Sequence, residues 1–170
     1  MNGKWVAGMI VGAAAVFGAG LWYSQVYAYY DRLDASSDVM LATRFDGTTE
    51  DILADALQGI DAETSPIKYR ACFTTPLSQA MMSETFVAYD RPEPLIAPSW
   101  FSCFDAKQIG ADLEAGNALA FLGEANTQYG VDRVIAVYPD GRGFAWHQIN
   151  PCGEAVFDGD PAPADCPPAP

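Results

Sequence analysis

The side chains whose chemistry is easiest to infer in this 170-residue sequence are its four cysteines, Cys72, Cys103, Cys152 and Cys166. Their number is even and no two form a CxxC pair, which argues against a thioredoxin-like redox centre and against haem attachment. A zinc site is also disfavoured, because structural zinc sites usually have closely spaced ligand pairs. The cysteines therefore predict two structural disulfides, which are typical of proteins from oxidising compartments.

Four cysteines can pair in three ways. We favour one bond between two aromatic-flanked, core-like stretches, residues 69–73 and 100–104. The second bond then ties down the proline-rich tail, residues 159–170, where closing a loop of about 15 residues stabilises a fold by roughly 3 kcal/mol. These two bonds are Cys72–Cys103 and Cys152–Cys166.

His147 is the only histidine of the chain. It falls on a predicted strand across from Arg133, whose positive charge would lower its pKa. Nucleophilic catalysis would require a serine or cysteine within reach, and there is no GxSxG motif; zinc binding would require a second ligand, and there is no HxH or HExxH motif. We interpret His147 as a half-buried polar residue, and the alternative is a base in a pocket shared with Arg133 and carboxylates.

Complete motifs for cofactors or metals are absent from the sequence. There is no Walker A phosphate-binding loop, and Gly141-Arg142-Gly143 lacks the third glycine of a dinucleotide-binding turn. Asp46-Gly47 and Asp158-Gly159-Asp160 are similar to the start of a calcium loop, but neither reaches a closing glutamate. We expect ordinary turns at both sites, with no cofactor and no metal.

Charge is distributed unevenly along the chain. No charged residue lies between Trp5 and Tyr30, whereas all 22 acidic residues come later and bring the net charge to −13. An acidic surface repels phosphate backbones and anionic lipids, so nucleic acid is excluded as a partner. A basic protein partner is permitted, although dispersed acidic residues also serve solubility.

The uncharged run predicts one transmembrane helix over residues 5–27. Its strongly apolar part is roughly 28 Å long at about 1.5 Å per residue, close to the thickness of a hydrocarbon core. Trp5 marks one edge and several aromatic residues crowd the other, as at membrane interfaces. Since Lys4 precedes the run, the positive-inside rule places residues 1–4 in the cytoplasm and the later residues outside.

The same run also has features of a cleaved signal peptide, because Val26 and Ala28 are small residues of the kind that a signal peptidase recognises. A removable signal usually has an apolar stretch of about 7–15 residues, and this one is longer. We therefore favour a retained signal anchor followed by a juxtamembrane linker over residues 28–38. Gly8 and Gly12 form a small-xxx-small pair, which predicts a helix-packing face; the alternative is that glycine is simply common in membrane helices.

Local signals predict an α+β domain over residues 39–158, with a mostly antiparallel sheet and one or two helices packed on it. The clearest helix is 106–115. Asp105 is its N-cap, Gln108 completes a variant of the capping box, and Gly116 ends the helix.

A β-hairpin is predicted from residues 133–138 and 142–149, because Pro139-Asp140-Gly141 between them is typical of a bulged turn. In this register small residues face large aromatic ones, as in a packed core layer: Ala136 faces Phe144 and Val134 faces Trp146. The other expected elements are strands at 39–45, 67–73, 84–89 and 118–122, a short helix at 48–56, and loops at 59–66 and 92–98.

Five stretches resemble those of a small uncharacterised family of single-span alphaproteobacterial proteins. They are residues 1–4, 25–30, 69–73, 94–98 and 150–154. The likeness runs along most of the chain and implies a bacterial inner-membrane location with a periplasmic domain. The family has no established activity, so the resemblance implies no site residues.

Two hypotheses about function follow. The first is a non-enzymatic accessory, assembly or scaffolding factor, tethered to the membrane and associated with a protein partner or with itself through the helix. The alternative is a periplasmic small-ligand binder or enzyme with a site that uses His147. A cavity beside His147 would favour the second hypothesis.

Overall fold

The computed structural model describes residues 2–33 and 38–168, and the chain separates into two compact units, Met1–Tyr30 and Asp31–Pro170. The first unit consists of α1 (Gly3–Tyr23) and a π-helical turn, η1 (Ser24–Ala28). This continuous helix is long and apolar enough to cross a membrane, and an N-terminal signal sequence has the same properties. The first unit therefore suggests membrane association or export.

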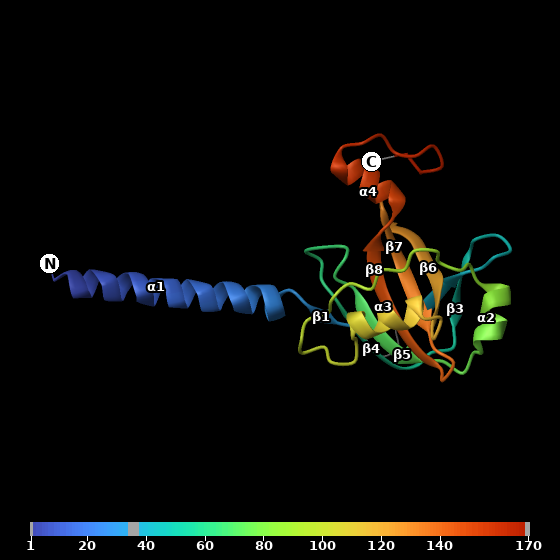
Figure 1. Ribbon diagram of the computed structural model, residues 1–170, viewed down its shortest axis with the longest axis horizontal. Helices are drawn as coiled ribbons and strands as arrows, with labels where there is room; N and C mark the ends of the chain where they lie inside the picture. The colour runs from blue at the N-terminus through green and yellow to red at the C-terminus, as the bar shows by residue number, and fades with distance from the viewer. Residues whose placement is uncertain (1, 34–37, 169–170) are drawn as a thin grey trace. The chain divides into compact units, whose positions relative to one another are not determined.

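The second unit is built on a six-stranded antiparallel sheet, and the predicted α+β class is confirmed (Figure 1). Its spatial order is β1 (Asp31–Arg32), β4 (Asp55–Asp61), β5 (Arg70–Thr74), β8 (Arg142–Ile149), β7 (Val131–Val137) and β6 (Leu119–Gln128). A separate two-stranded sheet pairs β2 (Val39–Ala42) with β3 (Thr49–Ile52), and the helices are α2 (Gln79–Thr85), α3 (Ala106–Glu114) and α4 (Pro151–Asp158).

The β7–β8 hairpin at the centre of this sheet has the predicted register. Ala136 pairs with Phe144 and Val134 pairs with Trp146, so each large ring lies opposite a small or branched side chain. The Trp146 side chain is completely buried. The alternation of small and large residues was sufficient to predict this pairing, because adjacent strands joined by a short turn leave few alternative registers.

One hydrophobic core joins the two sheets. It contains Leu41 of β2, Phe73 of β5, Phe121 of β6 and Ile135 of β7, all buried. Met82 of α2 packs into the same cluster. The apolar side chains of β2 are shielded from water by the larger sheet. The small sheet is therefore part of the same domain.

The helix predicted at 106–115 is confirmed as α3. The Asp105 carboxylate accepts a hydrogen bond from the Gln108 backbone N–H at 3.1 Å, as an N-cap does. The Gln108 amide does not reach back to complete a capping box. It donates instead to Asp112, one turn further along, at 3.0 Å.

The short helix predicted at 48–56 is wrong. Thr49–Ile52 forms β3, and β4 begins at Asp55. The Asp46 carboxylate accepts hydrogen bonds from Thr43 and Thr48, which closes a turn rather than capping a helix. Pairing with β2 then supplies the backbone partners that a helix would have made internally.

Three further segments differ from expectation. The loop predicted at 59–66 is strand up to Asp61, because β4 pairs with β5 on one side and β1 on the other. Of the strand predicted at 84–89, residues 84–85 are the end of α2, which Ser78 caps, and only Phe86 and Ala88 form isolated β-bridges. The helix α4 was not predicted, although Asn150 is its N-cap and Pro151 is its first residue. The covering loop at 92–98 is confirmed.

In the structure Cys72 is bonded to Cys103 and Cys152 to Cys166, which are the two pairs that the sequence favoured. The second bond connects α4 to the proline-rich residues that follow it. Of the predicted linker, Asp31–Arg32 forms strand β1. Residues 34–37 of that linker and residues 169–170 of the predicted tail lie outside the described residues.

Candidate functional site

His147 lies on β8 opposite Arg133 of β7, as the hairpin register predicted. Its side chain is only 6% exposed. The Arg133 Nε–H donates to His147 Nε2 at 3.0 Å, so the ring proton is on Nδ1, which donates to the Pro66 carbonyl at 2.6 Å. The Tyr69 ring stacks on the imidazole at 4.5 Å between ring centroids, and the Arg133 guanidinium lies over the Tyr69 ring.

Burial is the main cause that lowers the pKa of His147 from 6.5 to about 4, and the charge of Arg133 lowers it further. The imidazole is therefore neutral at physiological pH, and both of its nitrogens already have partners. A base must present a free lone pair to its substrate. The His147 ring in this arrangement holds β8, β7 and the Pro66 loop together and has no lone pair to offer.

A hollow of about 410 Å³ adjoins His147, lined also by Arg133 and three acidic residues, Asp31, Asp61 and Glu63. This is the kind of cavity that the enzyme hypothesis required. Among the described residues neither serine nor cysteine lines it, and the hydroxyl of Thr127, which does, donates to the Val131 carbonyl at 3.2 Å. Within residues 2–33 and 38–168 no group of three His, Cys, Asp or Glu side chains is placed to hold a metal ion.

A second buried polar cluster surrounds Asp132 of β7. Its carboxylate accepts from the Tyr89 hydroxyl at 3.1 Å, the Asn126 backbone N–H at 2.9 Å and the Asn150 amide at 2.8 Å. The same Asn150 caps α4 through the Gly153 backbone N–H at 3.0 Å. Burial and the neighbouring Asp132 carboxylate raise the pKa of Tyr89. This network connects Tyr89, the far end of β6 and the start of α4 to β7, and it leaves Asp132 with both carboxylate oxygens hydrogen-bonded.

The proline segment, residues 92–98, is held against the sheet by a buried arginine. Arg70 of β5 is 4% exposed, and it donates from Nε to the Leu95 carbonyl at 2.7 Å and from Nη2 to the Ile96 carbonyl at 3.3 Å. Burying a charged guanidinium is costly unless it is hydrogen-bonded. The Arg70 guanidinium is hydrogen-bonded to backbone carbonyls of this loop, and these bonds fix the position of the loop.

Gln148 of β8 fixes the start of the same segment. Its carbonyl oxygen accepts from the Glu93 backbone N–H at 2.8 Å and from the Trp146 indole N–H at 3.0 Å. Its amide donates to the Arg91 carbonyl at 2.9 Å. Residues 91–96 are therefore fastened at both ends by buried side chains of the sheet.

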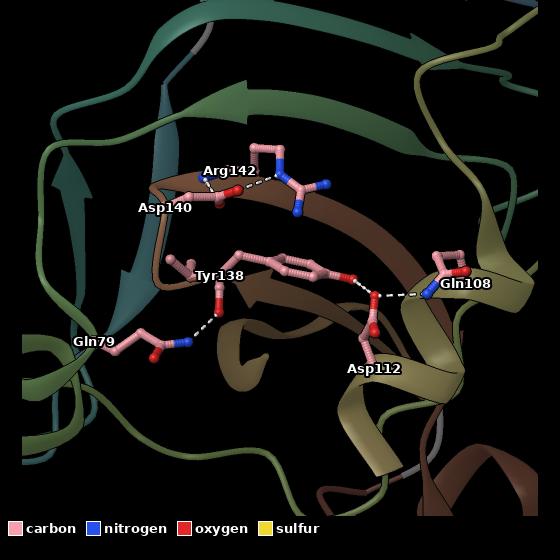
Figure 2. A network of polar contacts seen from close by, with 7 residues as sticks. Gln79, Gln108, Asp112, Tyr138, Asp140 and Arg142 are labelled. Atoms are coloured by element: carbon pink, nitrogen blue, oxygen red, sulfur yellow. Dashed lines mark hydrogen bonds and ion pairs between the residues drawn. The ribbon is translucent and has the colours of Figure 1, made fainter. Parts of the chain in front are cut away.

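The helix α3 is fastened to the β7–β8 hairpin by a tyrosine. Figure 2 shows the Tyr138 hydroxyl pointing at the Asp112 carboxylate, to which it donates at 2.8 Å. Burial and this hydrogen bond raise the pKa of Tyr138 to about 12. Hydrogen bonds from Gln108 and Tyr138 hold the pKa of Asp112 below its usual value. In the same view Gln79 of α2 donates to the Val137 carbonyl at 2.7 Å, so both helices are attached to one hairpin (Figure 2).

Between α3 and the fastened proline segment lies a groove of about 720 Å³, larger than the hollow beside His147. We call it the α3 groove: it is bounded by α3, by residues 118–120 at the start of β6 and by residues 88–94. Small side chains, among them Ala106, Gly110 and Ala111, make up much of its helical wall. Its charged residues are all exposed: Asp90, Glu93, Lys107 and Glu114.

A family model described as a family of unknown function, DUF6446, matches residues 39–167. The chain belongs to this family. The match covers the domain that carries the α3 groove and both disulfides, and it ends after Cys166. No curated protein and no solved structure matches this DUF6446 chain.

Sequence reasoning brought His147 and Arg133 together correctly, because both lie on one hairpin. It missed the α3 groove, whose walls are separated along the chain and meet only in the fold. One signal was present: Gly110 interrupts the otherwise helix-favouring sequence 106–115, and such a glycine usually has a packing or functional reason. Gly8 and Gly12 lie in α1, and their predicted role in helix packing stays a prediction.

Proposed function

We propose that this DUF6446 protein is a non-enzymatic accessory, assembly or scaffolding factor. It is anchored in the bacterial inner membrane, with its disulfide-bonded domain in the periplasm. The observation that carries the proposal is the contrast between its two concave surfaces. His147 lies in a polar hollow with both ring nitrogens already bonded, whereas the α3 groove is open, has small side chains and is fastened on both sides. Binding another protein is what the second surface suits.

The membrane topology in this proposal follows from charge and cysteines. Residues 5–27 span the membrane, Lys4 stays in the cytoplasm, and the domain folds where disulfides form. Mass spectrometry of the membrane-bound protein tests the anchor. We expect a mature N-terminus at or near Met1, and an N-terminus at Tyr29 would show that the helix is removed as a signal peptide.

Partner recovery tests the function itself. The full chain, tagged at its C-terminus, is cross-linked in intact cells and purified in a mild nonionic detergent. We expect one protein partner to be recovered reproducibly in near-stoichiometric amount. The matched control carries residues 1–30 fused to an unrelated disulfide-bonded domain, which separates binding through the domain from binding through the helix. Consistent recovery of the chain as a lone monomer would contradict the proposal.

A further inference from the structure

We infer that the α3 groove binds an extended, basic segment of a protein partner, with small apolar side chains against the helix and Lys or Arg at the acidic rim. This inference rests on the proposed function and adds the place of contact and the chemistry of the ligand. It is carried by the rigidity of the walls, by Gly110 and by the charges of the rim.

The groove is formed before anything binds. On one side Arg70 and Gln148 fasten the proline segment, and on the other Tyr138 fastens α3 through Asp112. Prolines also restrict the backbone of that wall. A partner therefore finds both walls in place and binding orders little of this protein, which is the condition under which a modest contact area gives useful affinity.

Gly110 has no structural reason to be a glycine. It lies in the middle of α3, where glycine destabilises a helix by about 0.5–1 kcal/mol relative to alanine. A Cβ built on it would meet only the Pro94 ring, at 3.9 Å, an ordinary van der Waals distance. The fold would accept a side chain at Gly110, so we interpret its absence as keeping the space next to this residue open. That space is the α3 groove.

The rim selects the charge of the ligand. The residues that line the groove include three exposed acidic residues, Asp90, Glu93 and Glu114, and one exposed basic residue, Lys107. Complementary potentials steer association and reject like charges. A second copy of this chain, with its net charge of −13, is therefore a poor occupant, and a segment carrying Lys or Arg is a good one.

The shape favours a chain segment over a small molecule. Sites for small ligands bury most of the ligand and direct a few placed polar groups at it. In the part of the chain that the structure describes, the one buried side-chain polar atom without a hydrogen-bond partner is the Tyr129 hydroxyl, and Tyr129 does not line the groove. The polar groups of the groove are instead at its exposed rim, where they suit the side chains of a passing segment.

Site-specific photo-cross-linking in cells tests the inference on the full chain. The photoreactive amino acid p-benzoylphenylalanine replaces Ala111, which is exposed and lines the groove. The matched control replaces Ala115, which is exposed at the end of the same helix and does not line the groove. We expect an adduct from position 111 and little from position 115. Peptide mapping of the adduct should place the cross-link in a segment that contains Lys or Arg.

Two further variants check the physical reasons. Ala111→Trp fills the groove and should reduce recovery of the partner by about tenfold, equivalent to roughly 1.4 kcal/mol, whereas Ala115→Trp should leave it unchanged. Glu93→Gln combined with Glu114→Gln removes two rim charges. It should weaken binding and flatten its dependence on salt, which screens exposed charges over about 10 Å at 0.1 M.

The outcomes separate this inference from the proposed function. Adducts from position 115 alone, or partner recovery unaffected by Ala111→Trp, would show that the α3 groove is not the binding site. The proposed partner-binding function would not be affected by that result. An adduct to a second copy of the chain, or to an acidic segment, would overturn the stated ligand. If no adduct forms at either position and cross-linking of the wild type also yields a lone monomer, both fail.

Discussion

Acidification to pH 5 should weaken the fold through His147. The neutral ring accepts from Arg133 Nε–H at Nε2 and donates to the Pro66 carbonyl from Nδ1. A second proton has to go onto Nε2, which breaks the first hydrogen bond and places two cations together in a site that is 6% exposed. Asp61 opposes this effect and Arg70 reinforces it, but burial is the largest cause of the lowered pKa.

The magnitude follows from the two pKa values, 6.5 in the unfolded chain and about 4 in the folded one. Between these values the unfolded state binds more protons, so this contribution to stability is complete above pH 6.5 and is lost as the pH falls through about 4. At about 1.36 kcal/mol per pKa unit the whole effect is roughly 3 kcal/mol, of which about 2 kcal/mol is lost by pH 5.

Urea unfolding of the full chain in nonionic detergent measures this loss. The tryptophan emission of the chain should shift to the red when the sheet opens, because Trp146 is fully buried on the strand of His147. We expect the free energy of unfolding to fall by about 2 kcal/mol between pH 7.5 and pH 5. The variant His147→Asn, whose amide can still donate to the Pro66 carbonyl, should be less stable at pH 7.5 but nearly independent of pH in this range.

This range of pH isolates the histidine. The carboxyl groups whose pKa is lowered by hydrogen bonds, Asp46, Asp112 and Asp140, lose their contribution as the pH falls through and below 3.8, outside the window. Equal slopes of stability against pH in the wild type and in His147→Asn would show that His147 does not cause the loss. A wild-type stability that is constant from pH 7.5 to pH 5 would show that there is no loss to explain.

Three other substitutions test the packing. Gly110→Ala should raise the free energy of unfolding by about 0.5–1 kcal/mol. Gly143→Ala is the contrasting variant: its Cβ would clash with the Phe73 ring, so it should lower the free energy of unfolding by about 1–3 kcal/mol. Urea midpoints that move in the same direction in both variants would contradict this contrast. Asn150→Ala removes the cap of α4 and a hydrogen bond to Asp132. It should lower the free energy of unfolding by about 2 kcal/mol and speed hydrogen exchange in α4. The control Asn117→Ala, on the surface, should lower the free energy of unfolding by less than about 0.5 kcal/mol. Cys152→Ser combined with Cys166→Ser opens the loop after α4, so proteolysis should cut that tail first with the sheet intact; cleavage no faster than in the wild type would show that other contacts order the tail.

Elements with strong local signals were predictable. The helix α3 has its cap, its apolar positions and its terminating glycine within one short stretch, and the β7–β8 hairpin has its turn and its pairing residues in continuous sequence. His147 and Arg133 could be placed together for the same reason. Residues 48–56 could not be predicted in this way, because they have the caps and acidic residues of a helix. Pairing with β2 instead makes residues 49–52 a strand.

The α3 groove depended on contacts between distant residues. Its proline wall is placed by Arg70 and Gln148, and its helical wall is placed by Tyr138 through Asp112. Nothing near residues 92–98 in the sequence indicates that Arg70 will donate to their carbonyls. A buried cation must find acceptors somewhere, but which acceptors it finds is decided when the sheet and its loops pack.

The amino-acid sequence by itself determined a long uncharged helix, an acidic disulfide-bonded domain and a central hairpin, because these depend on composition and on neighbours along the chain. The tertiary structure decided which residues could act. It enclosed the one histidine between an arginine and a carbonyl, which left it no free lone pair, and it left room for a side chain at Gly110, next to Pro94. Burial and hydrogen-bond satisfaction are properties of the packed chain, so they were decided only when distant segments met.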